Sequence, residues 1–199
     1  MQQFPSVDSF SSSVDGGHKG KWVDTDEMTR TLLSLLGEQL QADRTYIFHI
    51  RGEQLYNTHE WARKNTQTFR ESLFDIQAQQ TLPFFTKELR QNKNIVIHHI
   101  SNLENIKNPP TLEIQEMKKE FIERLLLVPI PNSVPQAEDE NSRISVGGFI
   151  GIDICKNNPS SENGSVAQFF TEKHIEQLRN CGSFIFMLHT LVELVTEQS

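Results

Sequence analysis

The transition from a helix to a β-strand lies within Leu36-Gly-Glu-Gln-Leu-Gln-Ala-Asp-Arg-Thr-Tyr-Ile-Phe48. Apolar residues recur at helical spacing before and into this stretch, at Met28, Leu32, Leu35, Leu36 and Leu40. Thr25, Asp26 and Glu27 precede that pattern and can cap the helix. The run 44–51 then becomes rich in β-branched and aromatic residues, which is typical of a strand. We therefore expect a helix over about 25–42 that leads directly into a strand.

A β-hairpin is predicted next, because Gly52-Glu53 separates the first strand from a second extended run, 54–62. With a two-residue loop Arg51 pairs with Gln54, and alternate side chains of both strands share a face. Counting from that pair gives one common face: Tyr46, Phe48, Ile50, Leu55, Asn57, His59 and Trp61. Aromatic rings with a few hydrogen-bonding groups are typical of a ligand-binding wall.

Two crossover connections, each with a helix, follow the hairpin. The first, 63–93, carries a predicted helix over 82–92 with Pro83 in its first turn, and the second, 101–122, carries one over about 111–120. Further strands are predicted at 94–100, 123–130 and 144–155. Leu125 to Val128 are consecutively apolar, which indicates a strand buried on both faces. Five to six strands with flanking helices make an α+β fold.

The composition limits the classes of function. The 199 residues suit one domain, over 24–199, after a Ser- and Gly-rich lead over 1–23 that we expect to be flexible. The 19 basic residues are scattered among 26 acidic ones, with a net charge of −7, so no nucleic-acid partner is expected. No segment approaches the ~20 apolar residues of a membrane span, so we expect no membrane contact. The only cysteines, Cys155 and Cys181, fit a reducing cytoplasm.

The last helix, predicted from an N-cap at Thr171 to Glu197, carries a heptad-like pattern. Its apolar residues repeat at alternating spacings of three and four: Leu178, Cys181, Ile185, Leu188, Val192 and Val195. This pattern predicts a coiled-coil dimerisation segment over 178–195. The alternative is that the same face packs on the chain's own sheet, at least in its first two turns.

Several segments resemble GAF domains, in the order in which that family has them. The stretch 36–48 resembles the first helix and strand of these domains, with their Ala-Asp-Arg-like corner. Asn57-Thr-His-Glu-Trp61 resembles a segment of GAF domains in bacterial sensor histidine kinases and cyclic-di-GMP signalling proteins. Leu82-Pro-Phe-Phe85 resembles their Pro-Trp-Trp helix start, and Leu126-Leu-Val-Pro-Ile130 with Gly148-Phe-Ile-Gly-Ile-Asp153 resembles their final hairpin. The resemblance covers about residues 25–195.

This resemblance implies a non-catalytic sensor in a two-component or cyclic-di-GMP signalling protein, acting as a homodimer on an output domain through its terminal helices. Those helices would pack on one face of the sheet, and the crossovers would roof a pocket for an unknown small molecule on the other. In chromophore-binding relatives the aromatic residue corresponding to Phe48 faces the pocket. Pairing then brings Tyr46, Asn57, His59 and Trp61 to the same side, with Phe84 or Phe85 closing the pocket.

Other functions are weighed against this one. The pocket aromatics could instead fill a closed core, which would leave a dimerisation scaffold. GAF enzymes that reduce free methionine sulfoxide use a cluster of cysteines, and this chain has two that lie apart. Covalent bilin attachment in related photoreceptors uses a Cys beside a His in the second crossover, and 101–122 contains neither. We expect a colourless domain without a cofactor or metal. His59 is the best single candidate ligand, but a hydrogen-bonded strand histidine explains it more simply.

Overall fold

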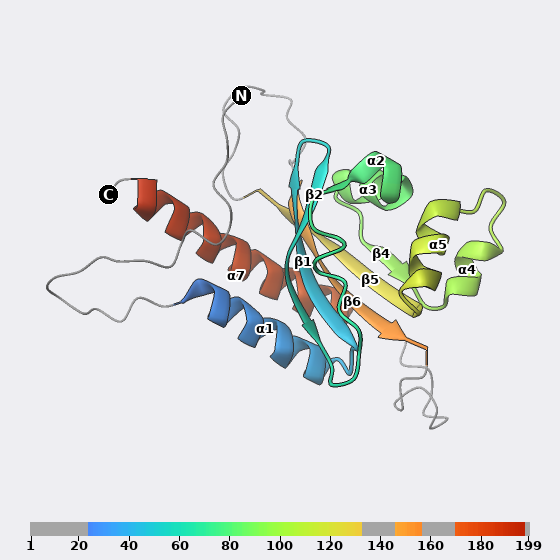
Figure 1. The fold of residues 1–199 in the computed structure, drawn as a ribbon, viewed down its shortest axis with the longest axis horizontal. Coiled ribbons are helices and arrows are strands. Elements are labelled where there is room, and N and C mark those ends of the chain that lie inside the picture. Colours follow the sequence, from blue (N-terminus) through green and yellow to red (C-terminus); the bar gives the residue numbers. More distant parts are fainter. Residues whose placement is uncertain (1–23, 133–145, 157–169, 198–199) are drawn as a thin grey trace, which may run out of the picture.

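The computed structural model describes residues 24–132, 146–156 and 170–197, and these form three layers (Figure 1). The predicted flexible lead over 1–23 lies outside the described residues, as do the connections 133–145 and 157–169. The central layer is an antiparallel sheet in the order β3-β2-β1-β6-β5-β4. Its strands are β1 (Arg44–Arg51), β2 (Gln54–Ala62), β3 (Ile76–Gln77), β4 (Ile95–Ile97), β5 (Ile122–Pro131) and β6 (Val146–Cys155).

Helices cover both faces of this sheet. On one face lie the terminal helices, α1 (Thr25–Gln39) and α7 (Glu172–Glu197). The other face is covered by the crossover helices: α2 (Ala78–Thr81), α3 (Pro83–Arg90), α4 (Ile100–Glu104) and α5 (Thr111–Lys119). The predicted fold class is therefore confirmed, although β3, α2 and α4 were not predicted as separate elements. Each of these is five residues or shorter, too short for hydrophobic periodicity to reveal.

Two hydrophobic cores result, one on each face of the sheet. In β5, Leu126 and Val128 pack against the terminal helices, whereas Leu125 and Leu127 belong to the core beneath the crossovers. The consecutive apolar run of β5 is therefore buried on both faces, as predicted. An alternating strand could serve only one of these two cores.

A β-bulge in the hairpin exchanges the faces of several predicted pocket residues. The pairing begins as expected with Arg51 opposite Gln54 and continues to Phe48 opposite Asn57. The next pair joins Ile47 to His59, so Thr58 is an extra residue in β2. A shift of one residue sends every later side chain to the other face. The predicted common face is therefore wrong for His59 and Trp61, which lie on the side of α1 and α7.

The terminal helix α1 fits closely over this part of the hairpin. The Trp61 ring lies so near Gly37 that a Cβ at position 37 would collide with it. The helix begins after Asp24, whose side chain, rather than that of Thr25, accepts hydrogen bonds from the N–H groups of Asp26 and Glu27. Trp61 is thus a packing residue between β2 and α1.

The helix α7 departs from the predicted dimer seam in its first half. Leu178 and Ile185 are fully buried against the sheet, and Cys181 packs beside them. Leu188 is half-buried, whereas Val192 and Val195 are exposed. The predicted seam is therefore wrong for Leu178 and Ile185, because the alternative, packing on the chain's own sheet, holds there. Besides Val192 and Val195, which stay predicted seam residues, four other apolar residues of α7 are exposed and form a stripe: Phe184, Met187, Leu191 and Leu194.

Three histidines lie where the hairpin meets the terminal helices. The His49 ring stacks on Phe186 with centroids 4.3 Å apart, and its Nε2 is buried with no hydrogen-bond partner among the described residues. His59 Nε2 lies 3.3 Å from Asp26 Oδ1 of α1, and His189 Nε2 lies 3.1 Å from Thr29 Oγ1. Burial, together with repulsion from His189, lowers the pKa of His49 to about 3 and that of His59 to about 4, although Asp26 opposes the second shift. Both imidazoles are therefore neutral at neutral pH.

These histidines make folding stability depend on pH. A histidine whose pKa is lower in the folded than in the unfolded state stabilises the fold fully above its unfolded pKa of about 6.5 and loses that contribution as pH falls. His49→Phe keeps an aromatic ring on Phe186 but cannot be protonated. Between about pH 7 and pH 5 we therefore expect the free energy of unfolding of the wild type to fall by about 1–2 kcal/mol more than that of His49→Phe. Urea unfolding at the two pH values measures the difference. The control is Val96→Ala, at an exposed position without a titrating group, which should lose stability between the two pH values as the wild type does. Equal losses in all three proteins would contradict the assignment.

Candidate functional site

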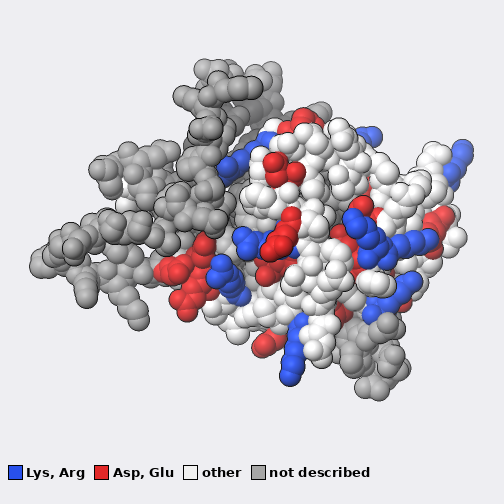
Figure 2. Space-filling model, in the orientation of Figure 1, with Lys and Arg blue, Asp and Glu red and all other residues white. Residues whose placement is uncertain are grey.

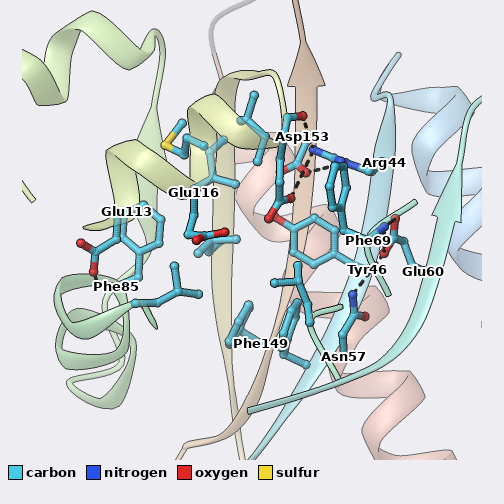
Figure 3. Close-up of a pocket in the computed structure, with 18 residues that line it drawn as sticks. Arg44, Tyr46, Asn57, Glu60, Phe69, Phe85, Glu113, Glu116, Phe149 and Asp153 are labelled. Carbon is cyan, nitrogen blue, oxygen red and sulfur yellow. Dashed lines mark hydrogen bonds and ion pairs between the residues drawn. The ribbon is translucent and has the colours of Figure 1, made fainter. Parts of the chain in front are cut away.

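A cavity lies between the sheet and the crossovers (Figure 3). Its volume is about 50 Å³, and this value rises to about 570 Å³ only when the adjoining space open to solvent is included. Strands β1, β2, β5 and β6 form its floor, while α3, α5 and the connection around Phe69 form its roof. This is the side on which the sequence predicted a pocket.

The walls of the cavity are mainly apolar and aromatic. The Phe48 and Phe149 rings stack with centroids 4.8 Å apart and 10° between their planes. The Tyr46 ring meets Phe48 edge to face at 5.7 Å. The remaining apolar lining is Phe69, Leu73, Leu82, Phe85, Met117, Ile122, Leu125 and Leu127. Such walls favour an apolar or planar group over a strongly hydrated one.

A buried ion pair closes one end of the cavity. Arg44 of β1 and Asp153 of β6 are direct partners in the sheet, and Arg44 Nε donates to Asp153 Oδ2 at 2.9 Å. The Tyr46 hydroxyl donates to the other carboxylate oxygen of Asp153 at 2.8 Å. All three residues are at least nine-tenths buried. Both oxygens of the carboxylate therefore have partners, as a buried charge requires.

Arg44 also ties both crossovers to the sheet. Its Nη1 donates to the Gln67 carbonyl at 3.4 Å, and its Nη2 donates to the Glu120 carbonyl at 3.2 Å. The guanidinium lies over the Phe69 ring, 4.8 Å from its centroid, and its Nη2 is 3.6 Å from Glu120 Oε2. The donors of Arg44 are thus directed at groups of the protein rather than at the cavity.

The carboxyl groups of this end are strongly perturbed. Burial raises the pKa of Asp153, although Arg44 and Tyr46 oppose the shift. Burial and the nearby Asp153 raise the pKa of Glu120 to about 8, again against the pull of Arg44. At neutral pH the Glu120 carboxyl therefore carries a proton for most of the time. Perturbed carboxyls of this kind are common at functional sites.

A second polar group lies on the β2 side of the cavity. Asn57 Nδ2 donates to Glu60 Oε2 at 3.1 Å, and the same carboxylate accepts from the Phe69 N–H at 3.1 Å. Asn57 is 1% exposed, and its Oδ1 is buried with no hydrogen-bond partner among the described residues. Because a carboxylate only accepts in these contacts, the amide nitrogen must face Glu60 and the oxygen must be the atom left over. This acceptor is buried beside the cavity without being accessible from it.

The structure brings together only some of the predicted site residues. Tyr46, Phe48, Asn57 and Phe85 line the cavity. Phe84 does not: it is 37% exposed and lines a separate surface hollow with Pro83, Pro110 and Leu112. His59 and Trp61 face the terminal helices because of the bulge at Thr58. Whether the four lining residues bind a ligand remains a prediction.

Sequence reasoning missed the charged half of the site: Arg44, Glu60, Glu113, Glu116, Glu120 and Asp153. For Asp153 a signal was available. It lies between Ile152 and Ile154, and a charge in a buried strand needs a partner of opposite sign. Arg44 gave no such signal, because it begins its strand between Asp43 and Thr45. Glu60 gave no such signal, because its face depends on the bulge. Glu113, Glu116 and Glu120 lie on or just after an amphipathic helix, where acidic residues are ordinarily solvated.

Comparisons with known proteins identify the fold. No protein-family profile matches the sequence, and no curated protein matches it. Among solved structures, a red/green cyanobacteriochrome in its red light-absorbing state aligns with a TM-score of 0.63 and 12% identity, over 86% of this chain and 97% of that one. The third GAF domain of a Synechocystis protein, in its photoproduct state, gives 0.61 and 11%, over 88% and 99%. A GAF domain/HD domain protein from Geobacter sulfurreducens gives 0.57 and 15%, over 86% and 95%.

These likenesses confirm the predicted resemblance at the level of the fold: the chain has the GAF fold over most of its length. Two further findings concern the described residues alone. None of their histidines, cysteines and acidic residues gather in threes in a way that could hold a metal ion. Nor does any helix among them combine the length and apolar character that crossing a membrane requires.

The buried ion pair should be important for folding. We expect Arg44→Met to destabilise the protein by about 3–5 kcal/mol, because Asp153 would stay buried without its cationic partner. Arg90→Met is the matched control: Arg90 pairs with Glu53 on the surface, so about 0–1 kcal/mol should be lost. The free energy of unfolding in urea measures both. Similar small losses would show that water satisfies Asp153 and that the pair is not structurally important.

Proposed function

We propose that this chain is a non-catalytic sensory domain that binds a small, partly apolar ligand in the cavity between its sheet and its crossovers. The observation that carries the proposal is the cavity itself, whose walls are mainly apolar and aromatic and whose one end holds the buried Arg44–Asp153 pair. Apolar walls with a few fixed polar groups are typical of sites for small ligands.

The known relatives of this fold agree with a sensory role. Several structural neighbours are cyanobacteriochromes, and a further neighbour was solved in a far-red absorbing dark state with bound biliverdin. For this chain the ligand class must be argued from its own residues. Occupancy of the cavity would be passed to an output domain through α1 and α7, which lie on the opposite face of the same sheet. A cytoplasmic signalling protein, of the two-component or cyclic-di-GMP type, is the setting that we propose.

The thiols do not favour the enzyme alternative. Burial raises the pKa of Cys155 to about 12, against the pull of Arg44, and that of Cys181 to about 11. A thiolate is the reactive form of cysteine, and at neutral pH both groups are protonated. This supports a binding domain over a reductase of methionine sulfoxide.

A nucleic-acid partner is not favoured either. On the face shown in Figure 2, basic and acidic side chains are interspersed, and uncharged surface separates them. With a net charge of −7, the protein lacks a field that would attract phosphates.

Ligand binding can be tested by native mass spectrometry of freshly purified protein, before and after incubation with a low-molecular-mass cell extract. We expect a bound mass, and we expect Phe149→Leu to weaken its retention by about fivefold to tenfold, because the stack with Phe48 is lost. Trp61→Phe is the control, since it changes an aromatic residue on the opposite face and should not affect retention. If no mass is bound under either condition, the dimerisation scaffold is the better description. If Trp61→Phe weakens retention as much as Phe149→Leu does, the ligand lies elsewhere.

We also propose that the domain forms a homodimer through α7, with a second copy of this chain as the partner. The exposed stripe Phe184, Met187, Leu191 and Leu194 has spacings of three, four and three residues, which is the pattern of a coiled-coil seam. Phe184 and Met187 flank Ile185 and Phe186, which pack on the sheet, whereas Leu191 and Leu194 lie beyond those turns. The predicted segment thus keeps its place on α7, but the apolar seam is rotated.

The dimer seam can be tested without removing any residue of the core. We expect the double variant Met187→Glu/Leu191→Glu to be monomeric, because four charges would face each other across the seam of a dimer. Lys173→Glu/Asn180→Glu, at exposed positions near the start of the same helix, should remain dimeric. Light scattering measures the mass of each protein. A seam variant that stays dimeric would place the interface elsewhere.

A further inference from the structure

We infer that the histidines between the hairpin and the terminal helices form a proton-binding site, which holds α7 in place when they are neutral and releases it when they are charged. The site consists of His49 on β1, His59 on β2 and His189 on α7, with Asp26 of α1 at its edge. It lies on the face of the sheet opposite the cavity, so it does not depend on the ligand proposed there. The proton would be a second signal that acts on the same helices.

His189 joins α7 to both strands of the hairpin and to α1. Its ring centroid is 5.7 Å from that of His49 and 5.3 Å from that of His59. Its Nε2 lies 3.1 Å from Thr29 Oγ1 of α1, and this hydroxyl donates to the Thr25 carbonyl at 2.7 Å. The hydroxyl therefore accepts from the His189 Nε2–H. Four elements thus meet at one imidazole.

His49 is poorly placed to carry a charge while α7 is packed on it. Its ring lies almost parallel to that of Phe186 of α7, with centroids 4.3 Å apart and 11° between the planes. Its Nε2 is enclosed, and no described residue gives this atom a hydrogen-bond partner. An imidazolium has an N–H on both nitrogens, so the charged form would bury a donor that has no acceptor. Moving Phe186 away would bring the ring into water.

The charged groups around the site also oppose protonation while α7 is in place. The two rings are repelled by each other and by three positive groups: His189 of α7, Arg51 of β1 and Arg70 of the connection after β2. Asp26 attracts a cation at His59 across 3.3 Å, but its side chain is 58% exposed, so water weakens this attraction. Burial and the repulsions therefore keep the pKa of His49 at about 3 and that of His59 at about 4.

Release of α7 would therefore take up protons. Once the rings meet water, both pKa values return toward the ordinary value of about 6.5. The packed arrangement is thus fully favoured above about pH 6.5 and loses this advantage as the pH falls. Between pH 7 and pH 5 the equilibrium for release should shift by about twentyfold for each histidine that is freed. Because Asp26 of α1 attracts the charged His59, α7 is the helix that is released.

Hydrogen exchange followed by mass spectrometry tests this release on the full chain, at a fixed protein concentration and after correction for the intrinsic effect of pH on amide exchange. We expect the protection of 186–197 to be at least about tenfold lower at pH 5 than at pH 7. Low concentrations of urea should hardly change exchange in 186–197 but should accelerate it in α1 and β6, because release exposes much less surface than unfolding does.

Variants show whether the histidines carry the response. The double variant His49→Phe/His59→Gln keeps a ring on Phe186 and an amide that can donate to Asp26, but neither new side chain can be protonated. Its protection over 186–197 should change by less than about threefold between the two pH values. Phe186→Leu is the control, because it loosens the contact and keeps the histidines. Its protection should be lower at both pH values and should still fall with pH as in the wild type.

The histidine resonances of the wild type give a measurement that needs no variant. Two imidazoles should titrate well below pH 6.5 by NMR, and titration of all the histidines near pH 6.5 would overturn the inference. The same holds if the protection of 186–197 is equal at pH 7 and pH 5, or if the double variant keeps the full response. If urea accelerates exchange equally in 186–197 and β6, or if α1 loses protection together with α7, protons destabilise more than α7 and the proposed release is wrong.

Discussion

Burying the Arg44 guanidinium beside the Asp153 carboxylate constrains everything around the cavity. Burying either charge without the other would cost too much free energy. The strands β1 and β6 must therefore pair in the one register that places the two residues opposite each other. The remaining donors of Arg44 then hold the carbonyls of Gln67 and Glu120, one in each crossover. Because the second oxygen of Asp153 accepts from Tyr46, the aromatic ring is drawn across Gly151, where a Cβ would collide with it. The roof, the floor and the shape of the cavity are therefore linked through a single ion pair.

The bulge at Thr58 lets one hairpin place side chains both in the cavity and against the terminal helices. Before the bulge, Asn57 faces the cavity, and after it Glu60 does, with only two residues between them. In regular alternation two residues that are three apart face opposite sides of a sheet. The extra residue thus makes the Asn57–Glu60 hydrogen bond possible and at the same time sends His59 and Trp61 to α1. Bulges are common beside functional sites for this reason, since they redirect side chains without changing the topology of the sheet.

The sequence could predict the elements whose hydrophobic pattern extends over many residues, and those that are marked by distinctive turn residues. The helix–strand corner at 36–48, the hairpin turn and the doubly buried run of β5 all carried such signals, and the GAF fold followed from their order. The cavity side of Tyr46 and Phe48 also followed, because the extra residue of the bulge lies in β2 and leaves the alternation along β1 unbroken. His59 and Trp61 could not be placed, because a bulge leaves no periodic trace. In α7 the heptad pattern was real, but two apolar faces overlap in its first half, and only tertiary packing shows that Leu178 and Ile185 belong to the core.

The two faces of the sheet are close enough for one to report on the other. In β6, Phe149 lines the cavity, and the next residue, Ile150, packs against α7. The contact there is tight, because a Cβ on Gly182 of α7 would meet both Ile130 and Ile150. No flexible side chain of α7 lies at that point to absorb a displacement of the strand. A ligand that shifts Phe149 and Phe48 would therefore move Ile150 directly against the backbone of α7, less than one helical turn before Phe184 begins the exposed stripe. This packing of Ile150 on α7 is the contact that the proposed signalling through the terminal helices would use.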